Sequence, residues 1–186
     1  MKLIRTDLPD VVLIEPQVFE DERGWFMESF NEQRFHEALR AQGLPLPQAF
    51  VQDNHSCSHK GVLRGLHYQQ APHAQGKLVR VVAGAAWDVA VDIRRDSTTF
   101  GKWVGVELSA ANKYMLWIPA GFAHGFVALE DNTHFLYKTT AYYHRESERS
   151  LRWDDPDLGV AWPEMQYVIS EKDRDASVFS ALQESS

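Results

Sequence analysis

The sequence predicts a mainly β protein, folded as an antiparallel sandwich, jelly roll or barrel. Many short segments with β-branched and aromatic residues follow one another at regular spacing, separated by turn-forming residues. Only one segment has a strong helical pattern. The chain has 186 residues, of which 44% are hydrophobic, which is enough for a sizeable core. With no repeat or linker to divide the chain, we expect a single domain over residues 1–186.

The amino-terminal part is expected to be extended. Residues 11–21 (VVLIEPQVFED) are rich in β-branched residues and end in the turn-prone EDERG. Residues 24–30 (GWFMESF) predict a second strand after that turn. Two consecutive strands are therefore expected before the helix.

Residues 31–43 (NEQRFHEALRAQG) predict the one clear helix. Asn31 suits the N-cap, and Gly43 suits the carboxyl-terminal end. Phe35 lies on the same helical face as Ala38 and Leu39, so this face is expected to pack on the body of the protein.

The remaining segments predict mostly strands. Residues 50–56 form a short one, and residues 77–94 are interpreted as a hairpin that turns at Ala83–Gly84. Residues 103–129 predict three strands joined by two turns, and residues 134–143 continue the pattern. We expect the tail from ISEKD onward to form a short helix on the outside.

The composition argues against several classes of partner. The net charge is −7 and the pI is about 5.6, whereas DNA-binding domains carry a basic face. Cys57 is the single cysteine, which excludes an intrachain disulfide and a cysteine-based zinc cluster. The start, MKLIRTDLPD, has charges within its apolar stretch, unlike a signal peptide, and no long apolar run predicts a membrane span. We expect a cytoplasmic protein without nucleic-acid or membrane partners.

The stretch GVLRGLHYQ (residues 61–69) contains the first candidate site. His67 is a buried structural histidine, a metal ligand or a catalytic base. Arg64 lies three positions before it, so a regular strand would direct the two side chains to opposite faces. Gly65 lies between them and is a suitable place for a bulge that turns both toward one pocket.

The residues after His67 argue against a metal site. Metal-binding cupin barrels use a His-x-His pair, but position 69 is Gln, and His73 lies in a proline-containing loop. Lys77 is a poor ligand because its ammonium has no lone pair. A base needs an orienting carboxylate, and spacing alone does not choose among the aspartates at positions 88, 92 and 173.

Two further stretches contain candidates. IPAGFAHGF (residues 118–126) has a Pro-x-Gly-x-x-His arrangement, similar to the second motif of cupin barrels, in which His124 is a pocket or a structural residue. Tyr137 lies in HFLYKTT, where a core tyrosine is the simpler interpretation. DERGWFMESF adds Arg23, an exposed arginine or a phosphate ligand.

Taken together, these stretches resemble one family, the dTDP-4-dehydrorhamnose 3,5-epimerases. The matching segments occur in the expected order between residues 23 and 173. They are DERGWFMESF, FVQDNHS, GVLRGLHYQ, QGKLVRV, WDVAVDIR, STTFGKW, WIPAGFAHGF, FLYKTT, LRWDDPDLGVAWP and ISEKD.

This resemblance implies a double-stranded β-helix (a cupin-like jelly roll) with a few short helices, and a homodimer whose amino-terminal strands pair across the interface. It implies a site without metal or cofactor that binds a dTDP-4-keto-6-deoxy sugar and epimerises it at C3 and C5. His67 matches the catalytic base, Asp173 its partner, Tyr137 the opposing acid and Lys77 a cation in the sugar pocket. The implied binding positions are Arg23, Phe26, Glu28, Gln52, Asp53, Asn54, Arg64, His124, Tyr143, Glu148 and Lys172.

Other functions stay open from the sequence. A mono-epimerase acting at C3 or C5 alone would keep His67, Lys77 and Tyr137. A keto-isomerase of a deoxysugar pathway, or a non-catalytic barrel that binds nucleotide sugars, fits the complete residue set less well. A metal-dependent cupin oxygenase lacks its ligands.

Overall fold

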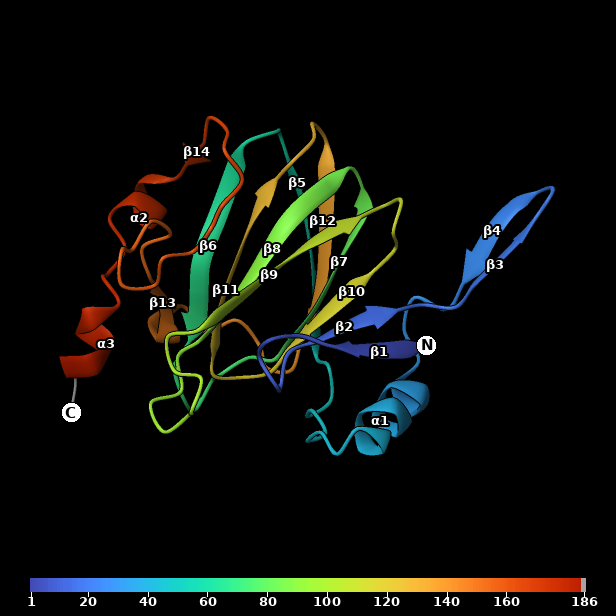
Figure 1. The fold of residues 1–186 in the computed structure, drawn as a ribbon, viewed down its shortest axis with the longest axis horizontal. Coiled ribbons are helices and arrows are strands. Elements are labelled where there is room, and N and C mark those ends of the chain that lie inside the picture. The colour runs from blue at the N-terminus through green and yellow to red at the C-terminus, as the bar shows by residue number, and fades with distance from the viewer. Residues whose placement is uncertain (185–186) are drawn as a thin grey trace.

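The computed structural model describes residues 1–184, which form two antiparallel sheets packed face to face (Figure 1). The first sheet has the order β1 (Lys2–Arg5), β2 (Val12–Glu15), β10 (Met115–Ile118), β7 (Lys77–Ala83), β12 (Thr133–Thr139) and β5 (Gln52–Ser58). The second has the order β13 (Glu148–Ser150), β6 (Val62–Gln69), β11 (Phe122–Ala128), β8 (Ala85–Asp92) and β9 (Trp103–Ser109), and β14 (Val168–Ile169) also pairs with β6. The expected single domain extends to residues 185 and 186, which lie outside the described residues.

The chain passes repeatedly from one sheet to the other, as in a cupin-like jelly roll. Strands β10, β11 and β12 follow one another in sequence and lie in the first, second and first sheets. The predicted fold class is therefore confirmed. The chain turns at Gly84, but the predicted hairpin over residues 77–94 is wrong, because β7 before the turn and β8 after it belong to different sheets. An alternating pattern of apolar and polar residues is the same whichever strand lies alongside. The pattern therefore does not show which sheet a strand joins.

The core between the sheets is apolar at one end and opens into a cavity at the other. Val79, Leu116 and Phe135 of the first sheet meet Ala90 and Phe126 of the second, and all five are buried. Side chains along β8 alternate between two apolar layers. Ala86 and Ala90 face this core, whereas Val89 and Val91 face the opposite side.

Helix α1 (Glu32–Ala41) covers the outer face of the first sheet. The Asn31 side chain caps it by accepting a hydrogen bond from the backbone N–H of Arg34, and Phe35 and Leu39 are buried against the sheet. Gly43 follows with φ of +68°, a conformation that favours glycine. The predicted helix and its apolar face are confirmed.

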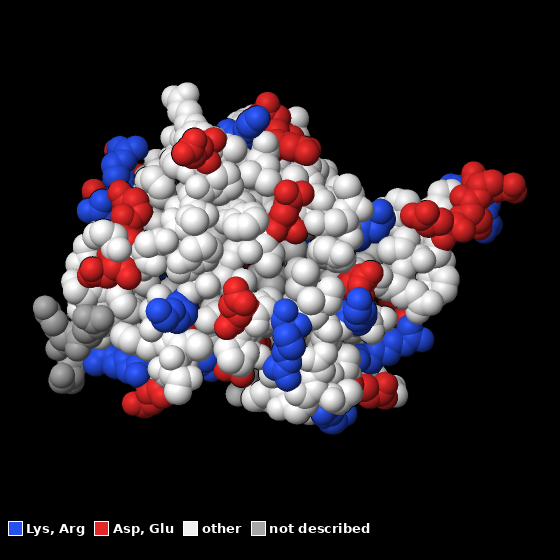
Figure 2. Space-filling view, viewed as in Figure 1, with Lys and Arg blue, Asp and Glu red and all other residues white. Residues whose placement is uncertain are grey.

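The segment between β2 and α1 is a separate hairpin. Pro16 interrupts the extended segment predicted over residues 11–21. In the described part of the chain, β3 (Val18–Asp21) pairs only with β4 (Gly24–Met27). The hairpin projects from the body of the molecule (Figure 1), and acidic side chains gather at its tip (Figure 2). Phe26 is 66% exposed there.

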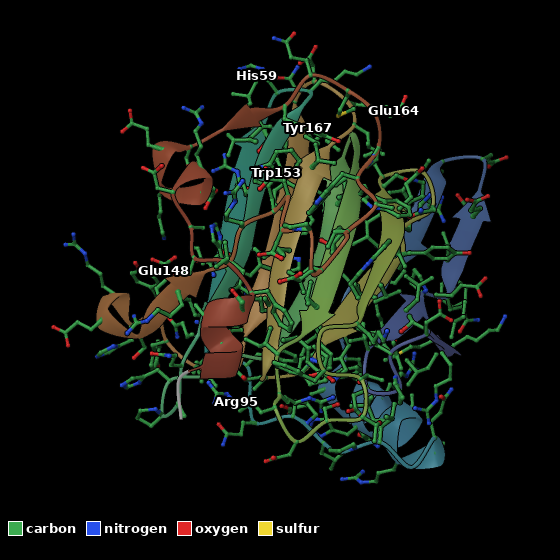
Figure 3. All side chains as sticks on the ribbon, turned by 60° about the vertical axis from the view of Figure 1, so that its left-hand side comes forward. His59, Arg95, Glu148, Trp153, Glu164 and Tyr167 are labelled. Atoms are coloured by element: carbon green, nitrogen blue, oxygen red, sulfur yellow. The ribbon has the colours of Figure 1, made fainter. Side chains whose placement is uncertain are left out.

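The carboxyl-terminal part packs on the outer face of the second sheet, as predicted for the tail. It contains the 3₁₀ turn η1 (Arg145–Ser147) and the helices α2 (Glu171–Arg174) and α3 (Ser180–Glu184). Trp153 and Tyr167 pack edge to face with ring centroids 4.8 Å apart (Figure 3). Within residues 1–184, no helix is both long and apolar enough to cross a bilayer.

Candidate active site

A bulge in β6 brings Arg64 and His67 to the same side of the second sheet. His67 lies opposite His124 of β11, and Arg64 lies opposite Phe126, so three steps along β6 match two steps along β11. Gly65 occupies the irregular position with φ of +131°, and a Cβ there would lie 2.5 Å from the Cα atom of Gly125. The predicted departure from regular strand near Gly65 is confirmed.

Both side chains line a cavity of about 350 Å³ between the two sheets. Most of its lining residues have a polar atom in the side chain, and several of these side chains can carry charge. The lining residues are Asn54, His55, Ser56, Arg64, His67, Tyr68, Gln69, Gln75, Lys77, His124, Phe126, Tyr137, Tyr143 and Glu148.

His67 is held by a buried carboxylate. Its Nε2 atom lies 2.5 Å from Oδ1 of Asp173, which is delivered by helix α2. The backbone N–H of Asp173 donates to the hydroxyl of Ser170, the N-cap of that helix. Burial alone would raise the pKa of Asp173, but hydrogen bonds from His67, Gly65 and Ser170 hold this pKa below its ordinary value. Asp173 is therefore ionised beside the His67 ring.

Lys77 supplies a buried positive charge at the start of β7. It is only 7% exposed, and its ammonium donates a 3.3 Å hydrogen bond to the backbone carbonyl of His67. Burial lowers the pKa of Lys77 to about 8, although the charges of Asp88 and Glu148 oppose this effect. The group is thus charged at neutral pH and titrates only slightly above it.

A second histidine–carboxylate pair lies beside the first. His124 accompanies His67 on the adjacent strand, and its Nε2 atom is 2.9 Å from Oδ2 of the fully buried Asp88. Burial lowers the pKa of His124, and the charge of Lys77 lowers it further, against the effect of Asp88. His124 is therefore a neutral hydrogen-bonding group at the cavity wall.

Tyr137 faces these groups from the opposite sheet. Its strand, β12, belongs to the first sheet, whereas His67 and His124 belong to the second. Burial raises the pKa of Tyr137, and the nearby charge of Glu148 raises it further, so the phenol keeps its proton. The cavity thus has a basic side chain on one wall and a protonated acid on the other.

The rim near β13 is a small polar network. Glu148, labelled in Figure 3, accepts a 2.9 Å hydrogen bond from the Tyr143 hydroxyl and pairs with Lys172 at 2.7 Å. Burial tends to raise the pKa of Glu148, but Lys172 and Tyr143 together lower it. Tyr143 and Glu148 line the cavity, whereas Lys172 stands behind Glu148.

Strand β5 contributes one of its three predicted binding residues to the cavity. Asn54 lines it, and Gln52 donates to Asn54 and accepts from the backbone N–H of Tyr143. Asp53 lies on the other side of β5, where it pairs with Lys138 at 2.9 Å.

Three further predicted binding residues lie on or next to the projecting hairpin, also outside the cavity of their own chain. Arg23 pairs with Asp21 at the tip of the projecting hairpin, and Phe26 is exposed on β4. Glu28 follows the hairpin and pairs with Arg34 of α1. Within residues 1–184, the predicted site is thus divided between the cavity and this hairpin.

The sequence did not single out three residues that shape the site. Asp88 appeared only as one of several carboxylates for His67, but it pairs with His124. Gln69 donates to the carbonyls of His73 and Tyr142, which ties two loops to the cavity wall. Phe126 lines the cavity directly. Alternation along the predicted strand of residues 118–126 would have placed Phe126 on the same face as His124.

Among residues 1–184, no three histidine, cysteine, aspartate or glutamate side chains gather as metal ligands. The two histidines that face the cavity from adjacent strands each contact a carboxylate through Nε2. The positive charge of Lys77 faces these two histidine–carboxylate pairs from the first sheet. The arrangement suits proton transfer beside a fixed cation.

Comparisons with known proteins point to one family. The family model for dTDP-4-dehydrorhamnose 3,5-epimerase matches residues 5–181. A relative of that name from Shigella flexneri is 55% identical over 179 residues, covering 96% of each chain. The structure of dTDP-6-deoxy-D-glucose-3,5-epimerase from Legionella pneumophila, in complex with dTDP-4-keto-L-rhamnose, has a TM-score of 0.89 at 50% identity, covering 96% of this chain and 93% of that one.

A more distant structure widens the range of activities on this fold. A 3'-monoepimerase from Streptomyces bikiniensis, in complex with dTDP-quinovose, has a TM-score of 0.87 at 33% identity and covers 98% of this chain and 89% of that one. The family match spans most of the chain, and the Shigella relative is identical to it at more than half of the aligned positions. The chain therefore belongs to the dTDP-4-dehydrorhamnose 3,5-epimerase family.

Proposed function

We propose that this protein epimerises dTDP-4-dehydro-6-deoxyglucose at C3 and C5 to give dTDP-4-dehydrorhamnose. The observation that carries the proposal is the pair of opposed walls, with His67 and its carboxylate on one sheet and Tyr137 on the other. Inversion at carbon needs a base on one face and an acid on the opposite face. Family membership and the sugar bound to the Legionella protein support the substrate class.

The chemistry starts from the acidity of the carbon atoms beside the ketone. Removing the proton from C3 or C5 gives an enolate whose negative charge lies on the C4 oxygen. His67 takes the proton on Nδ1, because its Nε2 atom is engaged by Asp173. The carboxylate orients the ring and stabilises the imidazolium, and a positioned base of this kind contributes about 10²- to 10⁴-fold to the rate.

Lys77 and Tyr137 complete the proposed cycle. The buried ammonium of Lys77 stabilises the enolate oxygen, and a fixed charge in a shielded cavity acts mainly in the transition state. Tyr137 then delivers a proton to the carbon from the opposite face, and the product keeps the oxidation state of the substrate. Because the raised pKa of Tyr137 keeps the phenol protonated, it is ready to act as the acid.

The remaining cavity residues are proposed to hold the nucleotide. Arg64 suits a phosphate because its guanidinium has several donors. Among the described residues only one of them, Nε, is engaged, donating to the hydroxyl of Ser58 at 3.2 Å. Tyr143 offers an exposed ring at the rim for stacking on thymine. Asn54 and Glu148 supply polar contacts, with Gln52 and Lys172 behind them.

We further propose a homodimer in which the β3–β4 hairpin of one subunit completes the cavity of the other. Within residues 1–184 the hairpin pairs with no other strand of its own chain, and β5 is an edge strand beside the cavity. Adding the hairpin to such an edge satisfies unpaired backbone groups and covers exposed aromatic residues. Arg23 and Phe26 would then reach the nucleotide of the partner subunit. A cytoplasmic location stays a prediction.

The test of function is hydrogen exchange followed by proton NMR. The 4-keto-6-deoxyglucose nucleotide is incubated with the protein in deuterium oxide. We expect both the C3 and the C5 hydrogens to be replaced by deuterium and the rhamno product to form. Exchange at one carbon alone would identify a mono-epimerase, and binding without exchange would identify a non-catalytic barrel.

A further inference from the structure

Phe126 is an exception in the cavity wall. It is the one lining residue, within the described part of the chain, whose side chain has no polar atom. Its ring lies parallel to that of Phe135 at a centroid distance of 4.0 Å and an interplanar angle of 3°. Phe135 is fully buried and Phe126 is 4% exposed, so both rings are held in place by packing.

The position of Phe126 along β11 relates it to the reacting groups. His124 and Phe126 are two residues apart on one strand, so both side chains face the cavity. His124 lies opposite His67, whereas Phe126 lies opposite Arg64. The Phe126 ring therefore lies next to His67 and His124, on the side toward Arg64.

This order matches the order of groups on the proposed substrate. The ketone at C4 belongs near Lys77, and the phosphate on C1 belongs near Arg64. Two edges of the pyranose ring join these ends. One edge carries the hydroxyls of C2 and C3, and the other carries the ring oxygen and C5, whose C6 methyl is the apolar substituent that suits an apolar ring. We infer that Phe126, supported by Phe135, contacts C6 and selects a methyl group over a hydroxymethyl group, an inference that rests on the proposed function.

The physical basis is the absence of a hydrogen-bonding partner on a phenyl ring. A methyl group gains by leaving water for an aromatic surface. A hydroxyl in the same place loses its hydrogen bonds to water and finds none in return. An apolar pocket rejects an added hydroxyl only moderately, so we expect a preference of about tenfold to a hundredfold.

Two ligands isolate this contact from catalysis. dTDP-6-deoxyglucose and dTDP-glucose both lack the ketone, so neither reacts, and they differ only by the hydroxyl on C6. Calorimetric titration is expected to show at least about tenfold tighter binding of the deoxy ligand. Phe126→Leu keeps an apolar surface and should keep the preference. Phe126→Ser should bring the two affinities within about threefold of each other.

The controls separate this contact from general effects. Phe100→Ser removes a phenylalanine that packs on Phe179 outside the cavity and should keep the wild-type preference. In wild type with dTDP-6-deoxyglucose bound, NMR should show a nuclear Overhauser effect between the C6 methyl protons and an aromatic ring. This effect should be lost in Phe126→Leu, so this test of the contact does not depend on the serine variant.

Each outcome decides the inference. Equal affinity of wild type for the two ligands, or a preference that survives in Phe126→Ser, overturns it while the proposed function stands. Failure of wild type to bind dTDP overturns the proposed function and the inference together.

Discussion

Nε2 of His67 lies 2.5 Å from Oδ1 of Asp173, although the two residues are 106 positions apart in the chain. This contact engages one ring nitrogen and leaves Nδ1 for the cavity. It also links strand β6 to helix α2, which joins the chemistry to the carboxyl-terminal part of the chain. His67 is thus positioned by helix α2, which lies in the outer layer on the second sheet.

Replacing either member of this pair should separate catalysis from binding. His67→Asn should abolish turnover and leave the affinity for dTDP nearly unchanged, because the ring acts on carbon. Asp173→Asn should lower kcat by about 10²- to 10⁴-fold, since the amide favours the wrong tautomer of His67. Steady-state kinetics and calorimetry check both variants. Parallel loss of nucleotide binding and turnover would instead indicate a structural histidine.

Tyr137→Phe should affect the two halves of the reaction differently. The base can still remove a proton and return one from solvent on the same face, whereas inversion needs the acid on the opposite wall. We expect exchange of the substrate hydrogens in deuterium oxide to exceed product formation clearly. If the two rates fall by the same factor, Tyr137 is not the separate acid.

The pH profile should show the titration of Lys77. Its pKa is lowered to about 8, so the ammonium is charged below this pH and neutral above it. We expect kcat to fall above about pH 8. Asp88→Asn removes a charge that supports the ammonium, so the falling limb should move to lower pH in this variant. A limb at the same pH in both proteins would contradict the assignment.

Burial of the Lys77 ammonium should also lower the free energy of unfolding. Because its pKa is about 8 in the fold and about 10.5 when unfolded, the unfolded chain binds more protons between these values, and stability rises with pH across that window. Lys77→Met should therefore raise the free energy of unfolding at pH 7 by about 1–3 kcal/mol, after subtracting the lost hydrogen bond. The gain should shrink toward pH 10.5, as measured by urea melts, while activity is lost at all pH values.

The proposed dimer predicts complementation between two inactive variants. One carries Arg23→Ala and Phe26→Ala in the hairpin, and the other carries His67→Asn in the cavity. A mixed dimer has one site with both parts intact, so random exchange of subunits should restore about a quarter of wild-type activity.

The unmixed variants serve as controls for this experiment. Sedimentation should show a dimer in each case. Absence of recovery despite demonstrated subunit exchange would show that the hairpin acts within its own chain or not at all.

Local patterns in the sequence predicted much of the fold. Alternation and turn residues revealed the strands, and the Asn31 cap with the Phe35–Leu39 face revealed α1, because these signals arise within a few neighbouring residues. The family resemblance added the roles expected for His67 and Lys77. Gly65 predicted the bulge that the structure confirms.

Long-range contacts determined the rest. Whether β7 pairs with β8 depends on which sheet buries each strand, and alternation is the same in both cases. From the residues alone, spacing did not choose among Asp88, Asp92 and Asp173. The fold assigns the first to His124, the second to Arg94 and the third to His67. These pairings are set by how two sheets and a terminal helix pack around one cavity, since burying a charge requires a specific partner that only the assembled layers provide.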